Sequence, residues 1–258
     1  MKRSKGKYED NGKDKKILAI KNISKNFTRS TGEFEVLKNI SLDIYEEEIV
    51  ALVGPSGCGK TTLLNIVSNI LTADSGEIVM DSDKVLAYIF QEPRLLPWLT
   101  VDQNIRFVQD NFPALEKADE IREKLLIRSG LLEFRDSYPG QLSGGMKQRL
   151  EIIRALSIRP DLVLMDEPFK SLDISLKYQL QEMILTEKEE YGFAVLFITH
   201  DPEEAVLLAD RVITLTDKPA GINKTIRIAL PREERSLKDE EIYSKYEEIL
   251  GFILSSPL

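Results

Sequence analysis

The chain has 258 residues, 42% of them apolar, which is enough for a sizeable core in one large α/β domain or two smaller ones. Its formal net charge of −8, from 43 acidic and 35 basic residues, argues against a broad nucleic-acid-binding surface. The single cysteine excludes an intramolecular disulfide and fits a reducing compartment.

The first residues are almost all polar or charged, and we expect residues 1–16 to be a disordered tail. No apolar core follows this basic start, and no run approaches about 18 apolar residues, so the sequence predicts neither a signal peptide nor a spanning helix. We therefore expect a cytoplasmic protein whose membrane association goes through a partner.

Alternating apolar residues from Ile17 to Ile49 predict a small antiparallel sheet. Phe27 lies within it as an isolated aromatic residue in a polar setting. By local sequence alone such a residue is more often part of a core than a platform for stacking adenine. Both roles stay open at this point.

The next stretch, residues 54–62, predicts a phosphate-binding loop with the spacing G-x-x-x-x-G-K-T between an apolar run and a helix-compatible run. Glycines let the backbone present successive N–H groups to phosphate oxygens, and the positive end of the following helix favours an anion. Lys60 supplies charge for the β and γ phosphates, and the Thr61 hydroxyl is placed to ligate Mg²⁺. The predicted nucleotide-binding residues are Gly54, Pro55, Ser56, Gly57, Cys58, Gly59, Lys60, Thr61 and Thr62.

Short apolar runs and stretches with helical spacing alternate after the loop. The runs over residues 75–79, 85–90, 162–165, 194–199 and 211–215 predict strands, and residues 101–108, 118–129 and 146–158 predict helices. Strands buried on both faces and separated by helices are typical of a parallel sheet covered by helices. Residues from about 92 to 158 would be a helical insertion between two strands.

Two prolines interrupt the segment Glu92–Leu99, which carries the apolar residues Leu95, Leu96 and Trp98. These side chains fit ordinary packing and an exposed docking surface equally well. The C-terminal part, residues 221–258, predicts a strand and an amphipathic helix packed on the main domain of residues 17–220. Ser236 is the expected N-cap of a helix ending at Leu254, with Ile242, Tyr246, Ile249, Leu250 and Ile253 on one stripe.

Chemically active residues follow two of the predicted strands, where ligands of a parallel sheet bind. Asp166 ends an apolar run and is placed to coordinate Mg²⁺ beside the phosphate loop. Glu167 projects differently and is the natural group to polarise a water for attack on the γ phosphate. His200, the only histidine, ends another strand, so we expect it to bond the γ phosphate or that water.

A second small-residue turn, Leu142–Arg149, also opens a helix. Its backbone N–H groups could meet an anion, although a helix cap without a ligand fits equally well.

This ordered set of motifs resembles the ATP-binding subunits of ABC transporters from about Ile17 to the end of the chain. The motifs are residues 54–61 as Walker A, Gln91 as the Q-loop, residues 142–148 as the signature, residues 162–167 as Walker B, Ser171–Asp173 as the D-loop and His200 as the switch histidine. The resemblance implies an α/β P-loop NTPase core of the RecA-like type, with an N-terminal antiparallel β-subdomain. It also implies that Phe27 stacks on adenine and that Gln91 acts in catalysis. By the same resemblance, Gln91, Thr61 and Asp166 would bind the metal ion.

The resemblance further implies a head-to-tail dimer, in which each ATP lies between the Walker A of one copy and the signature of the other. Ser143, Gly144 and Gly145 would then hold the partner's γ phosphate. ATP bridges two faces that otherwise bind weakly, and hydrolysis removes the bridge, so closing and opening would drive membrane partners.

The segments Gln91–Trp98, Glu167–Phe169 and Thr199–Ala205 are similar to the importer branch that serves nitrate, aliphatic sulfonates, taurine and thiamine precursors. This similarity implies membrane permeases that contact the region after Gln91, and an external solute-binding protein. Two departures stand out from the family pattern. Met146 occupies the usual glutamine position of the signature, and Lys170 and Ser171 replace the small residues that are usual where the chain enters the D-loop.

Other classes in the same fold are an exporter or cell-division cassette and a nucleic-acid-associated ATPase. The latter carries a long coiled-coil insertion or a second cassette, whereas the segment between Gln91 and Ser143 is short and lacks sustained heptads. With the acidic charge, this predicts no nucleic-acid partner. A binding module without turnover is disfavoured by Glu167 and His200.

Overall fold

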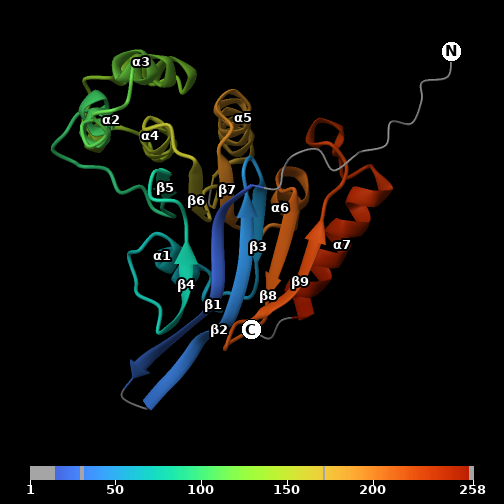
Figure 1. The fold of residues 1–258 in the computed structure, drawn as a ribbon. Helices are drawn as coiled ribbons and strands as arrows, with labels where there is room; N and C mark the ends of the chain where they lie inside the picture. The colour runs from blue at the N-terminus through green and yellow to red at the C-terminus, as the bar shows by residue number, and fades with distance from the viewer. Residues whose placement is uncertain (1–14, 30–31, 171, 256–258) are drawn as a thin grey trace.

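Two β-sheets organise the chain in a computed structural model that describes residues 15–29, 32–170 and 172–255 (Figure 1). The larger sheet has the strand order β5-β6-β7-β3-β8-β9, and the smaller has the order β2-β1-β4. The expected α/β class, with a mostly parallel sheet and an N-terminal antiparallel sheet, is confirmed. Among the described residues, no helix is long and apolar enough to cross a membrane.

The larger sheet is parallel except at one edge, where β9 runs antiparallel to β8. Its register aligns Leu52 and Asp166 with the same residue of β7, Ile198. The carboxyl ends of β6, β7 and β3 therefore lie side by side. The strands are β3 (Ile49–Val53), β5 (Leu86–Ile89), β6 (Leu162–Asp166), β7 (Ala194–Ile198), β8 (Arg211–Leu215) and β9 (Ile222–Arg227).

The core divides into two clusters on the two faces of this sheet. In β3, Val50 and Leu52 pack toward α1 (Lys60–Val67) and the smaller sheet, whereas Ile49, Ala51 and Val53 pack in the other cluster. All five residues are buried, because successive side chains of a strand point to opposite faces and both faces are covered. This explains the continuous apolar runs of the sequence.

The smaller sheet contains β1 (Lys16–Arg29), β2 (Gly32–Tyr45) and β4 (Ser75–Val79), all antiparallel. The expectation of a disordered tail over residues 1–16 is wrong at its end, since β1 begins at Lys16. Lys16 forms an ion pair of 2.8 Å with Asp43, and the Lys15 carbonyl accepts a hydrogen bond from the Glu46 backbone. The rest of that expectation concerns residues 1–14, which lie outside the described ranges.

Three helices between β5 and β6 form a lobe with a cluster of its own, on the side of the molecule opposite α7 (Figure 1). They are α2 (Val101–Gln109), α3 (Ala118–Arg128) and α4 (Gly144–Leu156), joined by short 3₁₀ turns at Leu132–Phe134 and Pro139–Gln141. Two further helices, α5 (Ile174–Tyr191) and α6 (Pro202–Leu208), follow β6 and β7.

The C-terminal helix α7 (Glu240–Ser255) begins later than the sequence predicted. The Asp239 carboxylate, not the Ser236 hydroxyl, accepts from the first backbone N–H groups, those of Glu241 and Ile242. Ser236 instead accepts from Lys238 in a preceding turn. Aspartate caps as well as serine, so the nearer of the two residues starts the helix. Ile242 and Ile249 are fully buried, as the apolar stripe predicted.

Candidate active site

The sheet order brings the predicted site residues to one edge. Gln91 follows β5, Asp166 and Glu167 end β6, His200 follows β7, and the loop after β3 comes next. The register continues past the strands, since the Glu167 backbone donates to the Ile198 carbonyl at 3.2 Å. Residues far apart in the sequence thus form one row at the carboxyl edge.

The loop between β3 and α1 has a backbone that requires glycine. Gly59 has a φ of 123°, and a Cβ there would lie 2.8 Å from Val36 Cγ1 and 2.9 Å from Leu37 Cδ2. Any larger residue would push the loop off β2. The close packing therefore holds the first N–H groups of α1 at the sheet edge, where an anion would be favoured.

Lys60 is buried, and its side chain turns back on this loop. Its ammonium donates to the carbonyl oxygens of Gly54 at 2.7 Å and Pro55 at 2.8 Å. Cys58 is also buried, and burial raises the pKa of its thiol. A protonated, enclosed thiol is unreactive and fills space in the loop as a small side chain.

Asp166 and Thr61 meet across the gap between β6 and α1. Burial raises the pKa of the Asp166 carboxyl, and a hydrogen bond with Thr61 and the nearby Lys60 charge oppose this rise. A carboxylate beside a hydroxyl is an oxygen donor set that suits Mg²⁺, which keeps several waters and needs no complete protein cage. In the described ranges, no group of three or more His, Cys, Asp or Glu side chains is arranged to hold a metal ion.

Glu167 lies in a cavity of about 230 Å³ that is also lined by Lys170 and His200. Its φ of 47° falls in the left-handed region, which costs a residue such as glutamate on the order of 1 kcal/mol or more. Its side chain is 16% exposed, with Oε1 3.7 Å from His200 Nδ1 and Oε2 2.5 Å from Lys170 Nζ. The lysine lies outside hydrogen-bonding geometry, so among the described residues Oε2 has an ion-pair partner but no hydrogen-bond donor.

The predicted aromatic residue Phe27 is half-buried, and its ring stacks on that of Phe34 at 6.0 Å between centroids. Lys218 Nζ lies 5.9 Å from the Phe34 ring and 3.9 Å from where a Cβ of Gly57 would be. Lys218 therefore connects the aromatic pair to the phosphate loop. The sequence prediction missed Phe34 and Lys218, and no local pattern marks the lysine, because only the fold brings it to the loop.

The signature residues Ser143, Gly144 and Gly145 lie at the start of α4, in the helical lobe. The Ser143 hydroxyl caps this helix by accepting from Met146 at 3.3 Å. In the described part of the chain, no hydrogen bond or ion pair joins these three residues to residues 54–62. One copy of the chain therefore does not bring the signature and the phosphate loop together.

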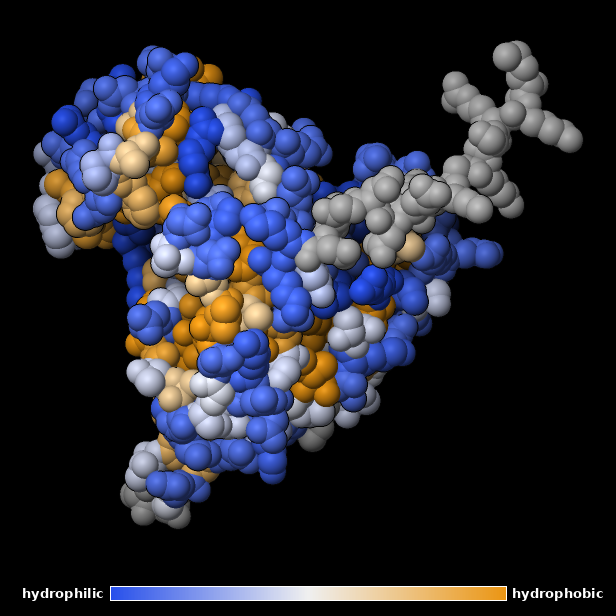
Figure 2. Space-filling model, in the orientation of Figure 1, coloured by the Kyte–Doolittle hydropathy of each residue, from blue (hydrophilic) through white to orange (hydrophobic). Residues whose placement is uncertain are grey.

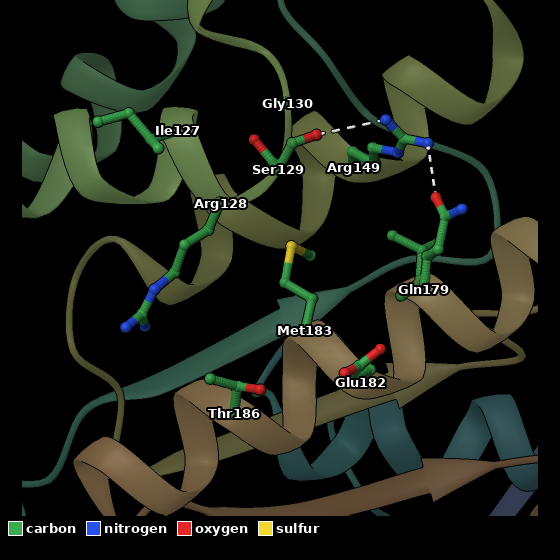
Figure 3. A pocket seen from close by; sticks show the side chains of 10 residues that line it. Ile127, Arg128, Ser129, Gly130, Arg149, Gln179, Glu182, Met183 and Thr186 are labelled. Carbon is green, nitrogen blue, oxygen red and sulfur yellow. Dashed lines mark hydrogen bonds between the residues drawn. The ribbon is translucent and has the colours of Figure 1, made fainter.

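A larger cavity, of about 470 Å³, lies between α3, α4 and α5 (Figure 3). Arg149 borders it and donates to the Ser129 carbonyl at 3.3 Å and to Gln179 at 3.1 Å, the two dashed bonds of Figure 3. None of the predicted site residues lines this cavity. The smaller cavity is lined by Glu167 and His200, two of the predicted site residues, and is therefore the candidate active site.

A phosphate loop beside buried carboxylates at the carboxyl edge of a parallel sheet defines a P-loop nucleotide hydrolase. The family model for ABC transporter proteins matches residues 37–170, and the chain belongs to this family as an ATP-hydrolysing cassette.

Three similar proteins support this assignment. The aliphatic sulfonates import ATP-binding protein SsuB 1 of Xanthomonas axonopodis pv. citri is 42% identical, over 78% of this chain and 83% of that protein. The nitrate transport protein NasD of Klebsiella oxytoca is 35% identical, over 93% and 97%. The ATP-binding cassette MJ0796, solved as a dimer in a post-hydrolysis state bound to ADP and Pi, has a TM-score of 0.72 and 28% identity, covering 83% of this chain and 100% of that one.

The Lys170–Glu167 ion pair leads to a first prediction. Replacing Lys170 with methionine should raise the ATPase turnover of the isolated protein about two- to fivefold, since a part-exposed pair of this kind is worth roughly 0.2–1 kcal/mol. In the role that the sequence predicts for Glu167, its carboxylate loses a competing cation and becomes freer to accept a proton from water. Phosphate release under saturating ATP measures this, and Lys170→Arg, which keeps the cation, should behave like the unmodified protein. A fall in turnover would mean that Lys170 assists the reaction.

Proposed function

We propose that this chain binds ATP with Mg²⁺, hydrolyses it between two copies, and so energises the uptake of a small solute through membrane permeases. The observation that carries the proposal is the row of Gln91, Asp166, Glu167 and His200 beside the phosphate loop. The two relatives named for sulfonate import and nitrate transport support a small anion as the solute.

Each side chain of the row, of the phosphate loop and of the aromatic pair would have a separate task. Lys60 would exchange its loop carbonyls for the β and γ phosphates, and Phe27 would stack on adenine. Thr61, Asp166 and Gln91 would hold Mg²⁺, which neutralises the phosphate charge and polarises the phosphoryl group. Glu167 would orient and deprotonate the attacking water, and His200 would bond the γ phosphate or that water.

Ser143, Gly144 and Gly145 would complete the site from a second copy. They are separated from residues 54–62 within one chain, and their backbone N–H groups begin a helix of 13 residues, a favourable end for a phosphate. Ser143 and Gly144 are exposed, so this helix start is accessible to a partner. The dimeric, ADP-bound and Pi-bound neighbour supports this arrangement.

The permease would dock on the helical lobe, after Gln91. A groove of about 440 Å³ there is lined by Tyr88, Phe90, Leu96, Phe107 and Phe112. Figure 2 shows apolar surface at the outer edge of this lobe, near the segment that joins β5 to α2. The groove is mostly apolar, but Arg94, Glu151 and Arg154 also line it. Such a groove suits a short helix of a membrane protein that carries both apolar and polar side chains. In this proposal the chain would lie at the inner face of the membrane, and an external solute-binding protein would act through the permease.

A variant at Trp98 tests the docking surface, because its side chain is 69% exposed and it closely follows Leu96, a residue of this groove, in the sequence. Trp98→Ser should leave the ATPase of the isolated chain within about twofold, yet lower solute-stimulated ATPase with the reconstituted permease by about tenfold or more. A lost aromatic anchor typically weakens an interface by about 2 kcal/mol. Tyr243→Ser on α7, where the residue is 50% exposed, is the matched control and should couple normally. Normal stimulation of the Trp98 variant would move the docking surface elsewhere.

A further inference from the structure

His200 lies in its site without a hydrogen bond of its own side chain to any other described residue. The imidazole is exposed, and its nearest charged group is Glu167 Oε1, 3.7 Å from Nδ1. Its position is therefore determined by the backbone on either side. The residues that restrain Thr199 and Asp201 decide where the imidazole lies.

Both neighbours of His200 belong to one ion-pair network. The Thr199 hydroxyl donates to Glu204 Oε2 at 2.5 Å and accepts from the Asp201 backbone at 3.0 Å. The Lys177 ammonium lies 2.5 Å from Asp201 Oδ2 and 2.9 Å from Glu204 Oε1. Of the residues that the structure describes, Lys177 is the one cation in this network, and it comes from α5, not from the histidine segment.

The network is partly shielded from water, most strongly at Glu204. The Lys177 side chain is 19% exposed, the Asp201 side chain is 32% exposed and Glu204 is buried. Without the lysine, two neighbouring carboxylates would face each other in a poorly solvated site, where an uncompensated charge is strongly unfavourable. The segment would then have to rearrange, and His200 would move with it.

The first turn of α5 also contacts the signature. A Cβ at Gly145 would lie 2.5 Å from Leu176 Cδ2, so the glycine backbone lies directly against this leucine. Consecutive helical residues point about 100° apart, which lets Leu176 and Lys177 contact different neighbours. The turn itself is held by Asp173, whose carboxylate accepts from the Leu176 backbone at 2.9 Å.

We propose that Lys177 is a positioning residue for His200, and that the first turn of α5 transmits movement of the signature turn to the histidine. The inference rests on the proposed function, in which the signature of one copy meets the nucleotide of the other. When the partner's nucleotide engages Ser143–Gly145, displacement of Leu176 would shift Lys177 and thereby the segment around His200. Each copy would complete the nucleotide site of its partner with its signature. That site would in this way be coupled to His200 in the nucleotide site of the same copy.

Kinetics of the full chain test this inference. Lys177→Met should lower kcat by about 10- to 100-fold, the effect of a misplaced catalytic group, with KM for ATP within about twofold. Lys177→Arg should restore kcat to within about threefold, because it keeps the cation. The double variant Lys177→Met/His200→Ala should be no slower than His200→Ala alone, because both changes act through one group.

Lys84→Met is the matched control. Lys84 is 22% exposed and likewise contacts two carboxylates, Asp161 at 2.9 Å and Glu46 at 3.8 Å. It precedes β5, however, and so lies at the amino ends of the parallel strands, away from the candidate active site. It should lower Tm about as much as Lys177→Met and leave kcat unchanged. If Lys177→Met does not fold, the double variant Lys177→Met/Glu204→Leu takes its place. It removes the lysine together with the buried glutamate that it pairs with, and it should show the same loss of kcat.

Unchanged kcat in the folded Lys177 variants, or a loss that adds to that of His200→Ala, would overturn the inference. Neither result would contradict the proposed function, because ATP hydrolysis by the unmodified chain tests that function separately.

Discussion

Glu167→Gln should leave ATP binding within about threefold of the unmodified protein while lowering kcat by about 10²- to 10⁴-fold. Glutamine has the same size as glutamate but does not accept a proton from water. Lys60 and Thr61, which would contact the nucleotide, keep their places, so affinity is retained. Phosphate release gives kcat, and titration with a fluorescent ATP analogue gives the affinity.

Glu92→Gln is the control for loss of one negative charge near the same sheet edge, since Glu92 is exposed just after Gln91. It should hydrolyse ATP at the unmodified rate. Normal turnover in Glu167→Gln would remove Glu167 as the base, whereas loss of both binding and turnover would indicate damage to the phosphate loop.

Ser143→Arg should abolish hydrolysis without weakening ATP binding to a single copy. Ser143 is exposed and makes no contact with residues 54–62 among the described residues, so a change there should not reach the nucleotide of its own chain. A bulky cation at the helix start would instead obstruct the partner's γ phosphate. Turnover should fall by more than about 10²-fold, the usual result of losing a phosphate-stabilising contact.

The dimer itself can be measured in the slow variant. ATP should convert Glu167→Gln to a dimer in light scattering, and adding Ser143→Arg should return it to a monomer. Ser236→Arg makes the same substitution at an exposed serine before α7 and should leave the dimer intact. A dimer that persists in the Ser143 variant would argue against a site shared between two copies.

The fold could be predicted closely because its strands are buried on both faces. The runs at Ile49–Val53 and Ala194–Ile198 are apolar throughout, a pattern that only covered strands require. Errors came where local signals compete. Ser236 and Asp239 both fit an N-cap, and the nearer one starts α7. Lys16 reads as part of a polar tail, yet pairing with β2 makes it the first residue of β1.

The candidate site was predictable only where neighbouring residues define it. The loop at residues 54–62 follows from residue types in a row, since Gly57 and Gly59 have positive φ angles that glycine adopts without strain. The contacts of Glu167 with Lys170 and His200 did not follow from the motif. Lys170 stands out in the sequence only as a departure from the family pattern, whereas in the structure its ammonium lies 2.5 Å from the Glu167 carboxylate. A spacing does not specify the rotamers that bring two charges together.

The sequence by itself determined the phosphate loop, the apolar strands and the acidic residues that end one of them, because these depend on contiguous residues and on the backbone they allow. Tertiary structure alone decided which strand ends are neighbours, and thus that His200 lies between Asp166 and the loop. It also decided that Lys177 and Leu176 join the histidine segment to the signature. The reason is physical: contacts between distant segments depend on strand order and helix packing, which no single stretch of residues encodes.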